Sequence, residues 1–433
     1  MNSVIGSLII VIIAIAIYIL LTVKGTSPII GALVATAFLS IFAIGGFFEN
    51  FFTNFTSGMS GMLGGFFLQF GFGTLFGKFM DMTGAADRVG HTLMVKMGEK
   101  RLVYALMIAT MLLAMTGAPH FALMPPLCYA LMKNAKLPRY IGLTAVAGAG
   151  TAATCLPGCM TAADVLPATI LGTTIYDGAD IGILCCVVQL ILVVLFVNHL
   201  IKKAEAKGEG YDPRADEPAM REDNDMPGFG ASLFAIILVI ALCAVFVMII
   251  GFQTLWAVVF STTIGMVYLY LVGRKYIHAN IWTETRNSIE GVMPVIVSVC
   301  AVMGFATVVS MTSAYQAVIP VILNWSIHPA VIAVLGTMLI TAMCADPISG
   351  GLAFAGTVGL QLIEKGANAG MVYRLCAITS YTFDTMPHGG ATTMAMRMFG
   401  YDIKTGYKYL FAVNLVTPTI YAIIAMFYSM IVY

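Results

Sequence analysis

The chain has 433 residues, of which 60% are hydrophobic and only 10% are charged, and its formal net charge is +1. Soluble domains carry about 25% charged residues, so this composition excludes an ordinary soluble domain, and the near-neutral charge gives no basic footprint for nucleic acid. Successive apolar runs of about twenty residues predict an all-α polytopic membrane protein. The nine cysteines lie almost wholly in apolar runs, so we expect neither a disulfide framework nor a metal site.

The first half, residues 1–201, alternates plain and interrupted apolar segments. Plain spans are predicted at about 3–23, 28–47, 59–79 and 181–201, with an amphipathic basic segment at 80–101. Segment 102–136 is too long for one span and breaks at Thr116-Gly117-Ala118-Pro119-His120, which predicts a re-entrant hairpin. Segment 139–175 is a broken helix, interrupted at Cys155-Leu156-Pro157-Gly158.

A hydrophilic stretch rich in Lys, Glu and Asp, residues 202–228, predicts a solvated linker before the second half, 229–433. In that half we predict plain spans at 229–251, 254–273, 289–311 and 406–432. Two more segments are interrupted: a hairpin, 329–366, and a broken helix, 371–397. Their breaks are Asp346-Pro347-Ile348-Ser349-Gly350-Gly351 and Asp384-Thr385-Met386-Pro387-His388-Gly389-Gly390.

The helix breakers are spaced alike in the two halves. Pro119 recurs as Pro347 and Pro157 as Pro387, at offsets of 228 and 230 residues. The tripeptide Thr110-Met111-Leu112 also recurs, 227 residues later, as Thr337-Met338-Leu339. We therefore predict an internal repeat. If each hairpin returns to the side that it entered, each repeat has five transmembrane helices plus one hairpin, and that odd number makes the two repeats inverted.

The distribution of Lys and Arg predicts the orientation. With hairpins that return, 20 of the 22 basic residues fall on one side of the membrane, and only Lys365 and Arg374 fall on the other. The positive-inside rule makes the first side cytoplasmic. We therefore expect a multi-pass protein of the cytoplasmic (inner) membrane, with the 202–228 linker in the cytoplasm and both termini outside.

Inverted repeats with broken helices at mid-membrane are typical of secondary transporters. A helix that begins there presents free N–H groups and the positive end of its dipole, which favour an anion. No Lys or Arg is predicted at mid-depth near the breaks, which favours a small carboxylate held by backbone and hydroxyl groups. The candidate substrate-binding residues are Thr116, Gly117, His120, Thr154, Thr161, Ser349, Gly350, Thr385, His388, Gly389 and Thr392.

Four titratable residues at the breaks are candidates for proton coupling: Asp384, Asp346, His388 and His120. An ionisable residue inside a membrane segment is a functional-site hypothesis by default. The two histidines occupy corresponding positions, each directly after its proline. The alternative is that Asp346 and Asp384 only cap the half-helices that follow them.

Several of these motifs resemble the gluconate permease (GntP) family, and the second broken helix is similar to its hydroxybutyrate-permease-like branch. The resemblance rests on Phe76-Gly77-Lys78-Phe79-Met80-Asp81-Met82-Thr83-Gly84, Gly98-Glu99-Lys100-Arg101, Ser349-Gly350-Gly351-Leu352 and Asp384-Thr385-Met386-Pro387-His388-Gly389-Gly390-Ala391. It implies a fold of the ion transporter superfamily, an elevator mechanism, a homodimer and proton-coupled uptake of a small hydroxy- or sugar-acid anion. The Ser-Asn-Thr tips of the sodium–dicarboxylate branch are absent from the sequence, which favours protons over sodium.

The sequence therefore predicts a proton-coupled symporter of a small organic monocarboxylate, not an enzyme, with no cofactor and with the lipid bilayer as its surroundings. A cation/proton antiporter on the same scaffold remains an alternative. A more remote one is an intramembrane aspartyl protease that uses Asp346 and Asp384, but Asp384 follows Tyr381-Thr382-Phe383 rather than a glycine-x-glycine motif.

Overall fold

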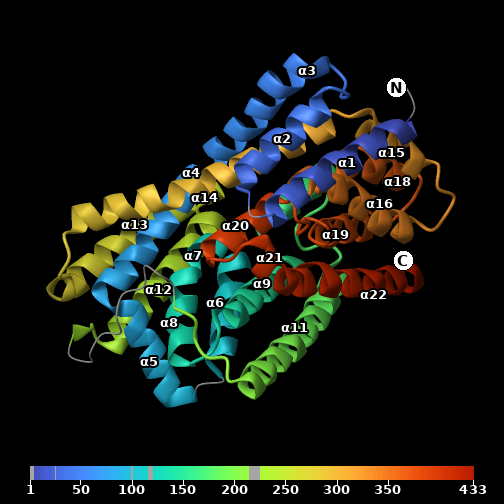
Figure 1. Cartoon of the computed structure of the whole chain (residues 1–433). Coiled ribbons are helices and arrows are strands. Elements are labelled where there is room, and N and C mark those ends of the chain that lie inside the picture. The colour runs from blue at the N-terminus through green and yellow to red at the C-terminus, as the bar shows by residue number, and fades with distance from the viewer. Residues whose placement is uncertain (1–3, 25, 99–100, 116–119, 214–224) are drawn as a thin grey trace.

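The computed structural model describes residues 4–24, 26–98, 101–115, 120–213 and 225–433, and all its regular elements are helices (Figure 1). The first half contains α1 (Val4–Val23), α2 (Pro28–Ser40), α3 (Gly46–Phe48), η1 (Glu49–Asn54), α4 (Phe55–Thr83), α5 (Ala85–Met97), α6 (Leu102–Met115), α7 (His120–Leu123), α8 (Pro125–Asn134), α9 (Arg139–Cys155), α10 (Ala162–Ile170) and α11 (Ala179–Lys207). The helix α11 thus continues past residue 202, where the linker was expected to begin.

The second half repeats this order of elements. It contains α12 (Phe229–Ala244), η4 (Val245–Ile249), α13 (Thr254–Gly273), η5 (Arg274–Tyr276), α14 (Ile281–Ser310), α15 (Ser313–Leu323), α16 (Pro329–Cys344), α17 (Pro347–Phe354), η6 (Ala355–Gly359), α18 (Leu360–Glu364), α19 (Ala369–Ser380), α20 (Gly390–Met398), α21 (Ile403–Phe411), η7 (Ala412–Val416) and α22 (Thr417–Val432). We call α6–α8 hairpin 1, α16–α18 hairpin 2, residues 156–161 the first break and residues 381–389 the second break.

Several helices begin at side chains that satisfy free backbone N–H groups. Asn280 accepts hydrogen bonds from the backbone of Trp282 and Thr283 at the start of α14. Asn368 does the same for Met371 at the start of α19. Such caps fix where a helix starts, because the first four N–H groups have no partner within the helix.

Four helical segments in the described part of the chain are long and apolar enough to cross a membrane. They are Ala179–Lys207, Leu255–Tyr276, Ile281–Ser310 and Ile403–Val432. Shorter apolar helices, among them α2, α6 and α16, supply the rest of the apolar framework. The predicted all-helical, polytopic architecture is therefore confirmed.

Helices α4 and α14 pack along each other and form the longest contact between the halves (Figure 1). Their approach depends on small residues. A Cβ atom on Gly304 of α14 would lie 2.7 Å from the carbonyl oxygen of Phe55, and one on Gly58 would lie 2.8 Å from the Cβ atom of Thr307. Small residues at such positions let helix backbones come close, which favours van der Waals packing in a lipid environment.

The helix contacts of one half recur in the other with the halves exchanged. Helix α1 packs on α2 as α12 packs on α13, and α2 packs on α14 as α13 packs on α4. Helix α6 packs on α9 as α16 packs on α19. Each helix that follows a break contacts the opposite hairpin, since α10 lies against α17 and α20 lies against α7. Each break is thus placed beside the hairpin of the other half.

Candidate functional site

The first break joins the end of α9 to the start of α10 and is tied to elements outside itself. The backbone N–H of Gly158 donates to the Ile175 carbonyl at 3.0 Å, and that of Met160 donates to the Met115 carbonyl at 2.9 Å. The first bond reaches the link between α10 and α11, and the second reaches the end of α6 in hairpin 1. Thr154, at the end of α9, is buried and donates its hydroxyl back to the Thr151 carbonyl at 2.9 Å.

Thr161 lies where the first break meets a residue of the second. Its hydroxyl donates to the Asp164 carboxylate and is 2.5 Å from the hydroxyl of Tyr381. The Tyr381 hydroxyl also donates to Asp164, at 3.3 Å. A candidate from the sequence is therefore part of a polar cluster that joins the two halves.

The second break holds its carboxylate inside the protein. Asp384 is 6% exposed and accepts the hydroxyl of Thr385 at 2.8 Å. The Tyr407 hydroxyl donates to the Thr385 carbonyl at 3.0 Å, and the Gly389 N–H donates to the Met386 carbonyl at 2.8 Å. The hydrogen bonds of this break therefore run mostly within it and to the nearby helix α21.

The tip of hairpin 2 touches the second break. Ala345 adopts a left-handed conformation with φ of 49°, and Asp346 then caps α17 by accepting the Ser349 N–H at 2.7 Å. A Cβ atom on Gly389 would lie 3.1 Å from the Ala345 carbonyl oxygen. The N-termini of α17 and α20 therefore converge, and Asp346 and Asp384 lie within electrostatic range of each other. Capping by Asp346 is observed alongside this placement.

Three further candidates surround this point in different ways. Ser349 is exposed at the tip, whereas Gly350 is buried against Thr341 of α16. Thr392, on α20, is buried, and its hydroxyl has no hydrogen-bond partner within the described residues. The structure therefore gathers the second-half candidates around the tip of hairpin 2.

The two histidines are placed differently although their sequence positions correspond. His388 is fully buried, lies against the backbone of Ala342 and Met343, and packs edge-on against Phe305 at 6.4 Å between ring centroids. His120 begins α7 and places its ring against Gly150 of α9. Thr116 and Gly117 lie outside the residues that the structure describes.

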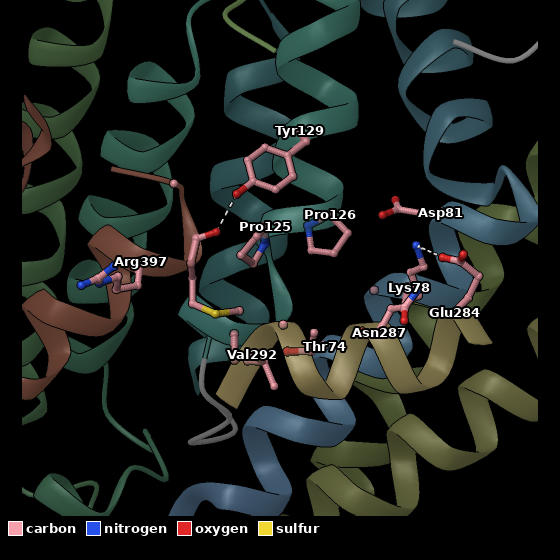
Figure 2. Close-up of a pocket in the computed structure, with 16 residues that line it drawn as sticks. Thr74, Lys78, Asp81, Pro125, Pro126, Tyr129, Glu284, Asn287, Val292 and Arg397 are labelled. Carbon is pink, nitrogen blue, oxygen red and sulfur yellow. Dashed lines mark hydrogen bonds and ion pairs between the residues drawn. The ribbon is translucent and has the colours of Figure 1, made fainter. Parts of the chain in front are cut away.

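A cavity of about 640 Å³ opens between α4 and α14 on one side and α7, α8 and the end of α20 on the other (Figure 2). Its lining mixes charged, polar and proline residues: Thr74, Gly77, Lys78, Asp81, Ala122, Pro125, Pro126, Tyr129, Glu284, Asn287, Ser288, Gly291, Val292, Arg397, Met398 and Gly400. Lys78 and Glu284 form an ion pair across it at 2.5 Å, and the Tyr129 hydroxyl donates to the Met398 carbonyl at 2.6 Å. The cavity thus gives polar access alongside hairpin 1.

Sequence reasoning missed Arg374, which was placed on the outer surface. The structure buries this side chain completely, and it donates to the carbonyls of Ile175 at 2.6 Å and Asp177 at 3.0 Å. Both acceptors lie in the link after α10, so a residue of the second half holds a loop of the first. Only its place within the first turns of a capped helix hinted at burial, because its partners lie almost 200 residues away in the chain.

Residues 6–431 match the profile of the GntP family permease. The chain belongs to this permease family. The resemblance found in the sequence motifs is thereby confirmed, and so is the expectation of a membrane transporter rather than an enzyme.

The permease is 23% identical to the uncharacterized transporter YxjC of Bacillus subtilis (strain 168), over 97% of this chain and 98% of that protein. It is 24% identical to a high-affinity gluconate transporter of Escherichia coli (strain K12), over 83% of this chain and 84% of the relative. It is 32% identical to the Gnt-II system L-idonate transporter of the same strain, over 44% and 43% of the two chains. Among solved structures, the YdaH transporter of Alcanivorax borkumensis aligns over 96% of this chain and 98% of its own, at 16% identity and a TM-score of 0.43.

Proposed function

We propose that the permease is a secondary transporter that carries a small organic acid anion together with protons. The observation that carries the proposal is the buried carboxylate of Asp384, which lies where the N-termini of α17 and α20 converge. Two helix N-termini favour an anion, and a buried carboxylate beside them repels that anion unless the carboxyl group is protonated. Binding of the proton and of the anion would then favour each other, as symport requires.

The names of the relatives support a sugar-acid or hydroxy-acid substrate. Relatives named as gluconate and L-idonate transporters align with this chain. The hydroxyl groups of such an acid match the candidate donors and acceptors near the tip of hairpin 2, namely Ser349, Thr385 and Thr392. Gly350 and Gly389 leave room for an anion to approach the backbone there.

We further propose that the chain is built from two inverted repeats, residues 1–201 and 229–433, joined by the linker 202–228. The exchange of contacts between the halves supports this arrangement, because α10 meets α17 as α20 meets α7. The charge asymmetry supports a cytoplasmic linker and termini on the outer side. An elevator movement of the hairpins and broken helices against α4 and α14, in a homodimer, follows from the family resemblance, and the cavity beside hairpin 1 would then be the route to the cytoplasm.

Uptake into proteoliposomes tests the proposal. Labelled gluconate, L-idonate, 3-hydroxybutyrate, lactate and citrate are offered under an inward proton gradient and then under a sodium gradient. The wild-type permease is compared with Asp384→Asn and with Glu364→Gln, which removes an exposed carboxylate on α18. We expect proton-driven accumulation of at least one acid by the wild type and by Glu364→Gln but not by Asp384→Asn.

Each other outcome has a defined meaning. Sodium-driven accumulation would overturn the assignment of the coupling ion. Proton-driven accumulation that survives Asp384→Asn would leave Asp346, His388 or His120 as coupling residues. Cation-dependent proton flux without uptake of any acid would replace the symporter with a cation/proton antiporter.

A further inference from the structure

Asp164 is a fully buried carboxylate that capping does not explain. It lies in the first turn of α10, whose N-cap residue is Thr161, and no side-chain capping bond is formed at that helix start. The donors to Asp164 are instead the hydroxyls of Thr161 and Tyr381, and both reach the same oxygen, Oδ2. The other oxygen, Oδ1, has no hydrogen-bond partner among the residues described.

Arg374 has a matching vacancy. Its Nε and Nη2 atoms donate to the carbonyls of Asp177 and Ile175, but its Nη1 atom is buried and has no partner in the described part of the chain. The charge of Arg374 acts on Asp164 although the two form no ion pair within the described residues. A buried donor and a buried acceptor without partners are each costly, so both point to a second state in which they meet.

The other titratable groups around Asp164 are few. Cys155 and Cys159 lie at the end of α9 and in the first break, and Tyr373 and Cys376 lie on α19. Helix α17 and η6 also pack against α10, and residues 347–359 contain no titratable side chain. Arg374 is therefore the cation that faces Asp164.

We propose that Asp164 is a second proton-binding carboxyl of the permease and that it alternates between two partners. When protonated, it keeps the arrangement seen here, in which Oδ1 carries the proton and Oδ2 accepts from Thr161 and Tyr381. When the proton leaves to water in the polar access route, the carboxylate pairs with Nη1 of Arg374. No other bond forms or breaks in this step.

Two connections link this switch to the rest of the site. Arg374 holds the link after α10, so its movement toward Asp164 pulls on the first break through the bond between Gly158 and Ile175. Tyr381 belongs to the second break and precedes Asp384 by three residues. This inference rests on the proposed proton symport, and it adds a proton-binding residue in the first half to the candidates of the second.

Infrared difference spectroscopy of the reconstituted permease tests proton binding without any substrate. The C=O stretch of a protonated carboxylic acid is followed over pH in the wild type, Asp164→Asn, Asp384→Asn and the control Glu364→Gln. We expect one titrating band to vanish in Asp164→Asn and to persist in Asp384→Asn and in the control. In Arg374→Gln, the deprotonated state loses its cation, so the same band should persist to higher pH.

The transport assay separates failure of this inference from failure of the proposed function. In Asp164→Asn we expect proton-driven accumulation of the transported acid to fall at least tenfold while exchange of labelled for unlabelled acid continues. An Asp164-dependent band without uptake of any acid would keep the proton site and sink the symporter. Proton-driven uptake unchanged in Asp164→Asn, with no band lost, would overturn the inference alone.

A variant that keeps the carboxyl guards against misfolding. Tyr381→Phe removes one donor to Oδ2 and leaves Asp164 in place. If Asp164→Asn does not fold, a shift of the band to higher pH in Tyr381→Phe still supports the inference, and an unchanged band in that variant contradicts it.

Discussion

The two breaks differ in where their hydrogen bonds go. The backbone of the first break is bonded to residues outside it, at Ile175 and Met115, whereas the second is closed by bonds of its own, such as Gly389 to Met386. Asp384 belongs to the second break itself, and its position in the repeat corresponds to Thr154 of the first half, 230 residues earlier. The first break is therefore tethered to the frame of hairpin 1, and the second is free to rearrange around a ligand.

This difference assigns different tasks to the repeats. The tethered break and its cluster of Thr161, Asp164 and Tyr381 suit transmission of movement between the halves. The second break, against the tip of hairpin 2, suits substrate contact. Five pairs of variants test the division.

The largest effect is expected at the pair of corresponding residues. Asp384→Asn should lower proton-driven accumulation at least about tenfold, the change that about 1.4 kcal/mol produces in an equilibrium constant. Thr154→Val should lower it less, because that hydroxyl is already bonded to the Thr151 carbonyl. Initial rates of labelled acid uptake measure both, and an equal loss in the two variants would contradict the division.

The next effect concerns the arginines at the starts of α9 and α19. Arg374→Met removes two bonds from a buried cation and should lower the free energy of unfolding by about 3 kcal/mol. Arg139→Met removes an ion pair with the half-exposed Asp212 and a 3.4 Å bond to the Phe399 carbonyl, so we expect about 1 kcal/mol. Unfolding in detergent, followed by tryptophan fluorescence, should rank them in this order.

The glycines of the breaks come third. A methyl group on Gly389 would press on the Asp384 and Ala345 carbonyls, so Gly389→Ala should cost about 1–3 kcal/mol and weaken substrate binding. Gly158 has φ of 85°, so Gly158→Ala should cost about 1–2 kcal/mol of stability. Substrate affinity should fall in the first variant and stay near the wild-type value in the second. A loss of affinity in Gly158→Ala alone would reverse the two roles.

A smaller effect is expected where α21 supports the second break. Tyr407→Phe deletes the hydroxyl that donates to the Thr385 carbonyl and should cost about 1 kcal/mol. Because Thr385 bonds Asp384, we expect the loss mainly as a raised KM for the acid. Tyr140→Phe deletes a hydroxyl bonded to the exposed Glu209 and serves as the matched control, with KM unchanged.

The smallest effect lies in the links after α10 and α20. The Thr405 hydroxyl and N–H hold the pKa of Asp402 below its ordinary value. This cap therefore stabilises α21 above the ordinary pKa of aspartate, and the contribution is lost as pH falls through the lowered value. Asp402→Ala should cost about 0.5–1 kcal/mol near neutral pH and nothing in strong acid. Asp177→Ala, which removes the acceptor of the Thr174 N–H, should cost no more.

Much of this architecture was predictable because its causes are local. Apolar runs of helical length, and prolines and glycines that stop them, are readable in one dimension. Hairpin 2 was expected at 329–366 and is observed from Pro329 to Glu364, and the broken helix expected at 371–397 is observed as α19 and α20. The convergence of Asp384 with the tip of hairpin 2 also follows the predicted grouping of the breaks.

By itself, then, the sequence determined the class of protein, its all-helical architecture and the positions of its breaks, since helix length and helix termination depend on neighbouring residues. Only the tertiary structure decided that Asp164 meets Tyr381, 217 residues away, and that Arg374 is buried against the link after α10. Those contacts arise because α10 packs on α17 and α19 of the other half. Packing between distant helices depends on the shapes of whole surfaces, which no local pattern records.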